Sequence, residues 1–95
     1  MNFYFRTNYN SEIGIGHYMR CYRLANFFKE RGHKCFIFVD KLDNNFLESL
    51  MIKPLYKSSE NFKNETIDSK RFIDEIKKLK KGYVIVDDYR IGYLW

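Results

Sequence analysis

The sequence predicts an α/β protein in which a parallel β-sheet is flanked by helices. Three observations predict this fold class. Apolar segments of strand length alternate with segments whose apolar residues repeat at helical spacing. The later strand segments are continuously apolar, as buried parallel strands are, and glycine-containing turns separate several of the elements. Strands that alternate with helices form βαβ units with right-handed crossovers, and 95 residues suffice for one small domain.

The first half of the chain reads as one strand–helix–strand unit. Residues 2–7 are predicted to form a strand, because their aromatic side chains suit a pleated sheet, and residues 8–12 are turn-rich. A helix begins after Gly16 and ends at Gly32, a typical C-terminal cap. Residues 35–39 form a continuous apolar run, which indicates a buried parallel strand. One apolar face of the helix is formed by Cys21, Leu24, Ala25 and Phe28.

The second half is less regular. We expect a short helix at residues 44–50, a short strand at 52–56 that Pro54 restricts to an edge or a strand start, and a loop at 58–66. Residues 83–86 form a buried strand. The helix before that strand is capped by Asp68 or Ser69, and its apolar positions are Phe72, Ile73, Ile76 and Leu79.

Composition excludes several classes of protein. Hydrophobic residues make up 45% and charged residues 31% of the chain, which is typical of a globular domain. No apolar run approaches the roughly 20 residues that span a bilayer, and the N-terminus does not have the pattern of a signal peptide, so we expect a cytoplasmic protein. Cys21 and Cys35 match no zinc spacing, and we expect both to be reduced and buried.

The net charge of +5 could indicate a protein that binds nucleic acid, but the basic residues are spread along the chain. Their one dense cluster lies near the end of a predicted helix, where cations meet the negative end of the helix dipole. A solvated helix terminus is therefore the better interpretation, although a basic domain still attracts a phosphorylated substrate at long range. The cluster consists of Lys77, Lys78, Lys80 and Lys81.

Ligands of parallel α/β folds bind beyond the carboxyl ends of the strands, and three segments are predicted to converge there. They are residues 6–16 after the first strand, the polar residues 58–60, and residues 87–89 after the last strand. In the first segment, Gly14, Ile15 and Gly16 precede a helix N-terminus, where the backbone can approach a phosphate. On its own this is a weak signal.

His17 is the sharper feature, because a helix N-terminus disfavours the imidazolium and keeps the ring available as a base. A capping or packing role is equally compatible with its position. Arg20 lies one turn further on the same face and suits a phosphate or a sugar carboxylate, with a surface salt bridge as the alternative. His33 lies in a helix-to-strand turn and is expected to be structural.

Other chemistries fit less well. A dinucleotide fingerprint needs a third glycine where Met19 stands, although Asp40 follows a strand where a ribose-binding carboxylate could lie. The phosphate loop of nucleotide triphosphatases is excluded, because the Gly-Lys-Ser/Thr string is missing. Asp87 and Asp88 are adjacent in the chain and point to opposite faces, so a carboxylate that binds sugar hydroxyls or orients a base is favoured over a metal site.

These strings together resemble a known family. Residues 5–7 (Phe-Arg-Thr), 13–21 (Ile-Gly-Ile-Gly-His-Tyr-Met-Arg-Cys) and 86–89 (Val-Asp-Asp-Tyr) resemble the N-terminal domain of the UDP-2,4-diacetamido-2,4,6-trideoxy-β-L-altropyranose hydrolases of pseudaminic acid biosynthesis. Spore coat polysaccharide biosynthesis proteins are close relatives of that family. Residues 56–60 look similar too, and the resemblance covers essentially all 95 residues.

The resemblance implies a Rossmann-like domain that is the N-terminal half of a glycosyltransferase B-type fold. It implies metal-independent hydrolysis of a UDP-sugar at the anomeric carbon without a cofactor, with His17 as the general base. Two positions depart from the family: Asn8 replaces an aspartate, and Asp88 stands where some members have histidine. The substrate-binding residues that motif and resemblance together indicate are Arg6, Gly14, Ile15, Gly16, Arg20, Asp87 and Tyr89.

Because residues 91–95 read as the start of another helix, we expect residues 1–95 to be a fragment without the C-terminal nucleotide-binding domain. Alone it is expected to be inactive, to bind UDP weakly at most, and to self-associate through an exposed interdomain face that includes Tyr18, Tyr89 and Trp95. No nucleic-acid or membrane partner is expected. The alternatives are a related glycosyltransferase, in which His17 deprotonates an acceptor hydroxyl, and a non-catalytic domain that binds a sugar or a protein.

Overall fold

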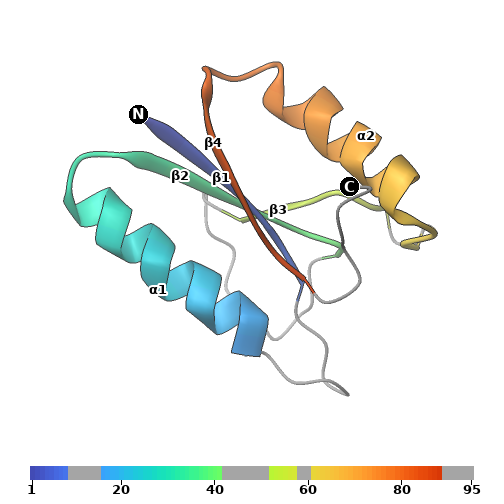
Figure 1. Ribbon diagram of the computed structural model, residues 1–95, viewed down its shortest axis with the longest axis horizontal. Helices are drawn as coiled ribbons and strands as arrows, with labels where there is room; N and C mark the ends of the chain where they lie inside the picture. Colours follow the sequence, from blue (N-terminus) through green and yellow to red (C-terminus); the bar gives the residue numbers. More distant parts are fainter. Residues whose placement is uncertain (9–15, 42–51, 58–60, 89–95) are drawn as a thin grey trace.

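A computed structural model describes residues 1–8, 16–41, 52–57 and 61–88 (Figure 1). Its sheet has four strands, all parallel, in the order β3-β2-β1-β4, and the two helices cover opposite faces. The predicted α/β class with a parallel sheet is therefore confirmed. The elements are, in chain order, β1 (Asn2–Thr7), α1 (Gly16–Glu30), β2 (Lys34–Val39), β3 (Ile52–Pro54), α2 (Glu65–Ile76) and β4 (Gly82–Asp87).

β1 is the central strand and pairs along its length with β2 on one side and β4 on the other. Its first residue, Asn2, lies opposite Lys34 in β2 and opposite Gly82 in β4. The backbones of Asn2 and Gly82 approach so closely that a Cβ atom on Gly82 would lie 2.1 Å from the Asn2 carbonyl oxygen. Only glycine can begin β4 in this register.

The strand order reverses direction around β1. The chain moves from β1 through α1 to β2 and on to β3, and then returns through α2 to place β4 on the opposite side of β1. The first crossover helix packs on one face of the sheet and the second on the other (Figure 1). This reversal makes the carboxyl ends of β1 and β4 the topological switch point, where α/β sheets bind their ligands.

α1 covers the face of the sheet that carries Phe5, Ile37 and Val39. Tyr18, predicted on an exposed interdomain face, is instead 3% exposed in this core, and that prediction is wrong. Leu24, predicted to be buried, is 38% exposed. The buried face of the helix is centred on Tyr18, Cys21 and Ala25, and Leu24 lies at the margin of this face. The residues that α1 contributes to the core or its border are Tyr18, Met19, Cys21, Tyr22, Ala25 and Phe28.

α1 ends as the sequence predicts, with Gly32 at a positive φ of 87°. The N–H of Gly32 donates to the Lys29 carbonyl and that of His33 to the Phe28 carbonyl, at 3.0 and 3.2 Å. These two bonds form a Schellman cap. The ring of His33 meets Phe3 edge-on at 5.3 Å, which agrees with the structural role expected of it.

α2 covers the other face, where Phe72 packs edge-on against Phe38 at 5.1 Å. The helix begins at Glu65, so the predicted loop extends too far by two residues. Its N-cap is Asn64, whose side chain accepts a hydrogen bond from the N–H of Ile67 at 2.9 Å. The prediction that Asp68 or Ser69 caps the helix is wrong, because Asp68 lies one turn inside it and is fully buried.

Among the strands that the structure describes, β4 lies at the edge of the sheet, and its exposure corrects the prediction of a buried strand at residues 83–86. Tyr83, Val84 and Val86 are 58%, 43% and 38% exposed. α2 lies over β1 and β2 and leaves β4 largely uncovered. Ile73 of α2 is therefore also exposed. Leu79, predicted to lie on the apolar face of this helix, comes after its last residue. The predicted helix at 44–50 and the polar residues 58–60 lie outside the described residues.

Three smaller predictions have clear outcomes. Cys21 and Cys35 are free and buried, as expected. The strand predicted at 52–56 is the three-residue β3, which lies at a sheet edge as Pro54 requires. Lys77 is the C-cap of α2, so the lysine cluster does begin at a helix end. In the part of the chain that the structure describes, neither helix has the length and apolar character to cross a membrane.

Candidate active site

The candidate site lies at the carboxyl edge of the sheet, where Thr7 ends β1 and Asp87 ends β4. The Thr7 hydroxyl donates a hydrogen bond of 2.8 Å to the Asp87 backbone carbonyl, which fixes the two strand ends to each other. Thr7 itself is fully buried. This bond crosses the topological switch point, so the Asp87 carboxylate is held at the position where such folds bind ligands.

Arg20 of α1 reaches this carboxylate and binds it with both arms of its guanidinium. Arg20 Nε donates to Asp87 Oδ2 and Nη2 donates to Oδ1, each at 2.8 Å. The hydrogen bond to Asp87 and the charge of that carboxylate raise the pKa of Arg20. The Arg20 side chain is 65% exposed and that of Asp87 is 24% exposed. A planar, solvent-facing guanidinium of this kind is suited to bind a phosphate or a carboxylate.

Cys21, the neighbour of Arg20, is not a candidate nucleophile. Burial, together with the negative charge of Asp87, raises the pKa of its thiol to about 11, and a hydrogen bond with Thr7 and the charge of Arg20 only partly oppose this rise. The thiolate is the reactive form of cysteine, so this side chain stays neutral and inert at physiological pH. It acts as part of the α1 core.

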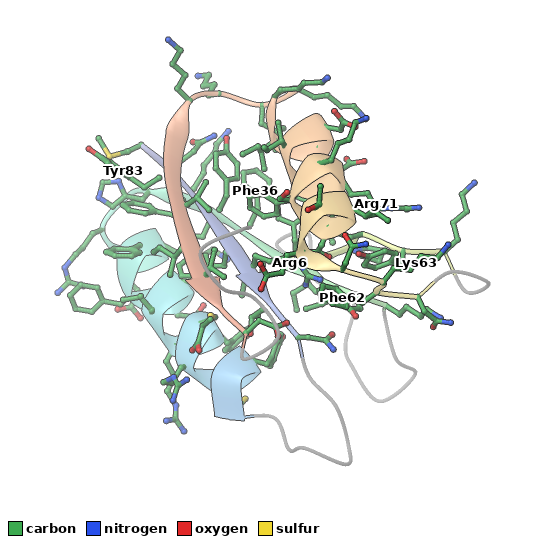
Figure 2. All side chains as sticks on the ribbon, turned by 45° about the vertical axis from the view of Figure 1, so that its right-hand side comes forward. Arg6, Phe36, Phe62, Lys63, Arg71 and Tyr83 are labelled. Carbon is green, nitrogen blue, oxygen red and sulfur yellow. The ribbon has the colours of Figure 1, made fainter. Side chains whose placement is uncertain are left out.

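Arg6 lies on the opposite face of β1, in the interior beneath α2 (Figure 2). Its guanidinium is fully buried and makes five hydrogen bonds, which equals its number of N–H donors. Two go to backbone carbonyls, of Thr7 and Phe38, and the other three go to the carboxylates of Asp68 and Asp40. Arg6 thereby connects β1, β2 and α2.

The carboxylates hold the charge of Arg6 in place. Burial lowers the pKa of Arg6, but the hydrogen bonds and charges of Asp68 and Asp40 outweigh it and raise the pKa overall. Asp68 Oδ1 also accepts a hydrogen bond of 2.6 Å from the hydroxyl of Tyr56. Burial raises the pKa of Tyr56, and its hydrogen bond to Asp68 adds to that effect, so the phenol stays protonated.

Asn8, which differs from the aspartate of the family that the sequence resembles, has a structural contact here. Its side-chain carbonyl accepts a hydrogen bond of 3.2 Å from the backbone N–H of Asp40. Asn8 follows β1 and Asp40 follows β2, so the bond joins two neighbouring strand ends. Asp88, the second departure, is 8% exposed.

The structure brings some of the predicted site residues together and leaves others undescribed. Arg20 and Asp87 are paired, whereas Arg6 is engaged in the interior on the other face. Gly16 is the first residue of α1, and His17 follows it, three positions before Arg20 on the same helix; the His17 side chain is not described. Gly14, Ile15 and Tyr89 lie outside the described residues.

Sequence reasoning missed Asp68 and Tyr56 as partners of Arg6. The signal was present: an arginine inside an aromatic strand needs a buried counter-charge, because an unpaired buried cation is very costly. Which of the twelve acidic residues supplies it depends on how α2 packs, and the sequence alone does not fix that.

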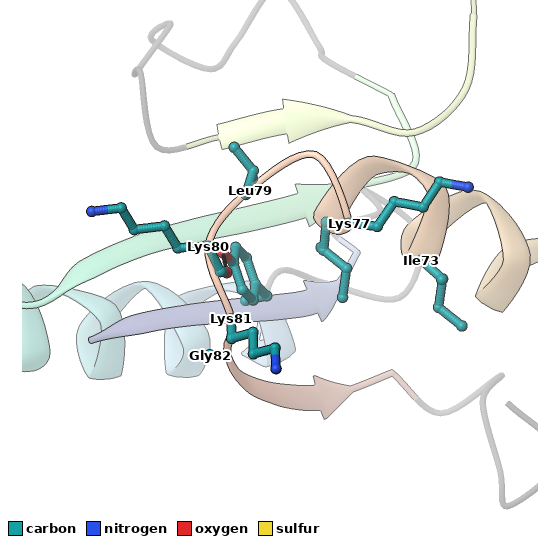
Figure 3. Close-up of a pocket in the computed structure, with 8 residues that line it drawn as sticks. Ile73, Lys77, Leu79, Lys80, Lys81 and Gly82 are labelled. Carbon is teal, nitrogen blue, oxygen red and sulfur yellow. Dashed lines mark hydrogen bonds between the residues drawn. The ribbon is translucent and has the colours of Figure 1, made fainter.

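A hollow of about 490 Å³ lies away from this edge, at the amino end of β4 (Figure 3). Tyr4 and the end of α2 form its apolar part, and three lysines surround it. Because it lies at the opposite end of the strands from Thr7 and Asp87, it is not part of the candidate active site. Its lining residues are Tyr4, Ile73, Ile76, Lys77, Leu79, Lys80, Lys81 and Gly82.

Neither a group of metal ligands among the described residues nor a match to a known protein indicates a function. Within residues 1–8, 16–41, 52–57 and 61–88, no three His, Cys, Asp or Glu side chains are grouped so that they could hold a metal ion. Comparisons of the chain with family models, with curated proteins and with solved structures find no match. The evidence for a function therefore lies in the fold, the site and the sequence motifs.

Proposed function

We propose that this chain is the base-bearing part of a nucleotide-sugar hydrolase with a glycosyltransferase B-type fold. Its substrate is a UDP-linked diacetamido-trideoxy sugar, and its pathway is the biosynthesis of nonulosonic acids such as pseudaminic acid for surface or spore-coat polysaccharides. The reaction releases UDP and the free sugar. Under this proposal the nucleotide is held chiefly by a second Rossmann-like domain.

The observation that carries the proposal is the position of the Arg20–Asp87 pair. It joins α1 to the end of β4 at the point where the strand order reverses, next to the β1 end. His17 is on the same helix, three positions before Arg20, and follows the glycine-containing segment. Residues at positions i and i+3 of a helix share a face, which supports a common site for His17 and Arg20.

In the proposed mechanism His17 accepts a proton from water while the water oxygen bonds to the anomeric carbon. The bond from that carbon to the phosphate oxygen of UDP breaks, and the configuration inverts. Backbone N–H groups at Gly14, Ile15 and Gly16 and the positive end of α1 stabilise the departing phosphate. Arg20 binds a phosphate oxygen, and Asp87 and Tyr89 orient sugar hydroxyls. No metal or cofactor takes part in these steps.

The test is a UDP-release assay on the complete gene product with a UDP-2,4-diacetamido-2,4,6-trideoxy sugar. The wild type should release UDP and free sugar without an added acceptor, and His17→Ala should lose about 10²–10⁴-fold in turnover. His33→Gln is the matched control, because His33 packs at the other end of α1 and should retain activity. Undiminished turnover by His17→Ala would exclude the histidine as the base.

The same assay separates the alternatives. UDP release that requires an added sugar or lipid acceptor would identify a glycosyltransferase. Binding of the sugar without any release of UDP would identify a non-catalytic domain. For the chain of residues 1–95 by itself we expect no turnover, and micromolar affinity for UDP in an NMR titration would contradict that expectation.

A further inference from the structure

The main chain and the side chain of Asp87 are fixed by two different elements of the fold. Thr7 and Asp87 are the final pair in the register of β1 and β4, and the Thr7 hydroxyl donates to the Asp87 backbone carbonyl at 2.8 Å. The Asp87 carboxylate is bound by both arms of Arg20 from α1, each at 2.8 Å. A movement of the Asp87 main chain would therefore also displace the carboxylate that holds Arg20.

Thr7 is itself held in one orientation. Its side chain is fully buried, and a β-branched side chain is restricted at χ1. Its backbone carbonyl accepts a hydrogen bond of 2.6 Å from Nη1 of the buried Arg6. Thr7 is therefore a rigid point between the interior network beneath α2 and the solvent-facing Arg20–Asp87 pair.

Helix α1 has a second link to the same hydroxyl. The hydroxyl has one hydrogen, which the Asp87 carbonyl accepts, so its oxygen is the acceptor for the Cys21 thiol, its hydrogen-bond partner in α1. Cys21 directly follows Arg20 in the chain. One side chain of α1 thus binds the Asp87 carboxylate, and the next is connected to the Asp87 carbonyl through Thr7. Loss of the hydroxyl would remove both of its bonds, and a buried polar group without its partner is costly.

We propose that Thr7 is a positioning residue of the candidate site, whose hydroxyl sets the Arg20–Asp87 pair and thereby the arginine that binds the substrate phosphate. The role of the pair toward a substrate rests on the proposed function. Thr7 is fully buried and acts through Asp87, without touching the substrate. The property that this position needs is the hydroxyl. Serine should therefore replace threonine here, whereas valine, which has a similar shape but no hydroxyl, should not.

The first test follows the arginine Nε–H groups of the chain by NMR and needs no substrate. Exchange of the Arg20 Nε–H with water should be about tenfold faster in Thr7→Val, the effect of one lost hydrogen bond, and should be unchanged in Thr7→Ser. Arg6 is the internal control, because its Nε–H also donates to a carboxylate, that of Asp68, at 2.8 Å. A general loosening of the fold would speed exchange at both arginines, whereas a positioning role speeds it at Arg20 alone.

The second test measures kcat/KM for UDP release by the complete gene product. Thr7→Val should lower kcat/KM about tenfold, and Thr7→Ser should stay within about threefold of the wild type. Thr66→Val is the matched control, because it makes the same substitution at an exposed threonine in the first turn of α2. This variant should retain the activity of the wild type.

The outcomes separate this proposal from the proposed function. Equal Arg20 exchange in Thr7→Val and the wild type, equally faster exchange at Arg6 and Arg20, or a Thr7→Ser protein that behaves like Thr7→Val would each overturn the positioning role. Undiminished kcat/KM in Thr7→Val would overturn it as well. A wild type that releases no UDP would instead refute the proposed function, and the exchange measurement would still decide whether Thr7 sets the pair.

Discussion

Arg6 and Asp68 are 62 positions apart in the chain and meet in the interior, where Arg6 Nε and Nη2 donate to the two carboxylate oxygens of Asp68 at 2.8 Å each. Both side chains are fully buried. The pair is also the centre of a wider network, since Asp40 binds the same Arg6 nitrogen and Tyr56 donates to Asp68. The packing of α2 on the sheet is therefore tied to the carboxyl ends of β1 and β2, beside the candidate site.

We predict that Asp68→Ala destabilises the chain by about 3–5 kcal/mol, because it leaves the Arg6 cation buried with fewer partners. Urea unfolding followed by circular dichroism measures this free energy. Asp74→Ala is the control on the same helix. Asp74 pairs with Lys77 at the surface, and its loss should change stability by no more than about 1 kcal/mol. Equal effects of the two substitutions would show that the buried network contributes no more than a surface ion pair.

The local elements were largely predictable from the sequence, because their signals are local. Aromatic residues indicated β1, and the positive φ needed at Gly32 marked the end of α1. The errors arose where tertiary packing decides. Whether the apolar residues 83–86 are buried depends on the position of their strand in the sheet, and these four residues alone do not determine the strand order.

The candidate site was predictable to a similar extent. Arg20 and Asp87 were both named from the sequence, and their direct pairing requires α1 to pack against the end of β4. Arg6 was named as a substrate-binding residue, yet all its N–H groups donate to partners inside the protein. An arginine after an aromatic run looks the same in sequence whether it faces a ligand or a buried aspartate.

Gly82 should not tolerate even one methyl group. A Cβ atom there would lie 2.1 Å from the Asn2 carbonyl oxygen and 2.7 Å from its carbon, so β4 would have to move away from β1. We expect Gly82→Ala to cost about 1–3 kcal/mol, measured by thermal or urea unfolding. Gly16→Ala is the control, because a Cβ atom at Gly16 meets nothing within 4 Å. A Gly82→Ala protein as stable as Gly16→Ala would contradict the close approach of the two strands.

Alkaline pH should weaken the fold through Cys21. Its pKa is about 11 in the folded chain against an ordinary value of 9.0, so folding favours the neutral thiol. That contribution is complete below the unfolded pKa and is lost as pH rises from about 9 through about 11. Urea unfolding at a series of pH values should show stability falling over this window, and less steeply in Cys21→Ala. Tyr56, whose pKa is also raised, leaves a residual slope in the variant. Equal slopes in the two proteins would contradict the prediction.

Arg20 should matter for the proposed reaction and little for the fold. Its side chain is 65% exposed, and ion pairs in water contribute little to stability, so Arg20→Gln should unfold at nearly the wild-type urea concentration. If Arg20 binds the substrate phosphate, the same change removes a charged hydrogen bond and should lower kcat/KM for UDP release by the complete gene product about 10–100-fold. Arg23→Gln, an exposed arginine three positions further along α1, is the matched control and should retain activity. Equal kcat/KM values for the two variants would remove Arg20 from the site, whereas loss of folding in Arg20→Gln alone would assign its pair with Asp87 a structural role.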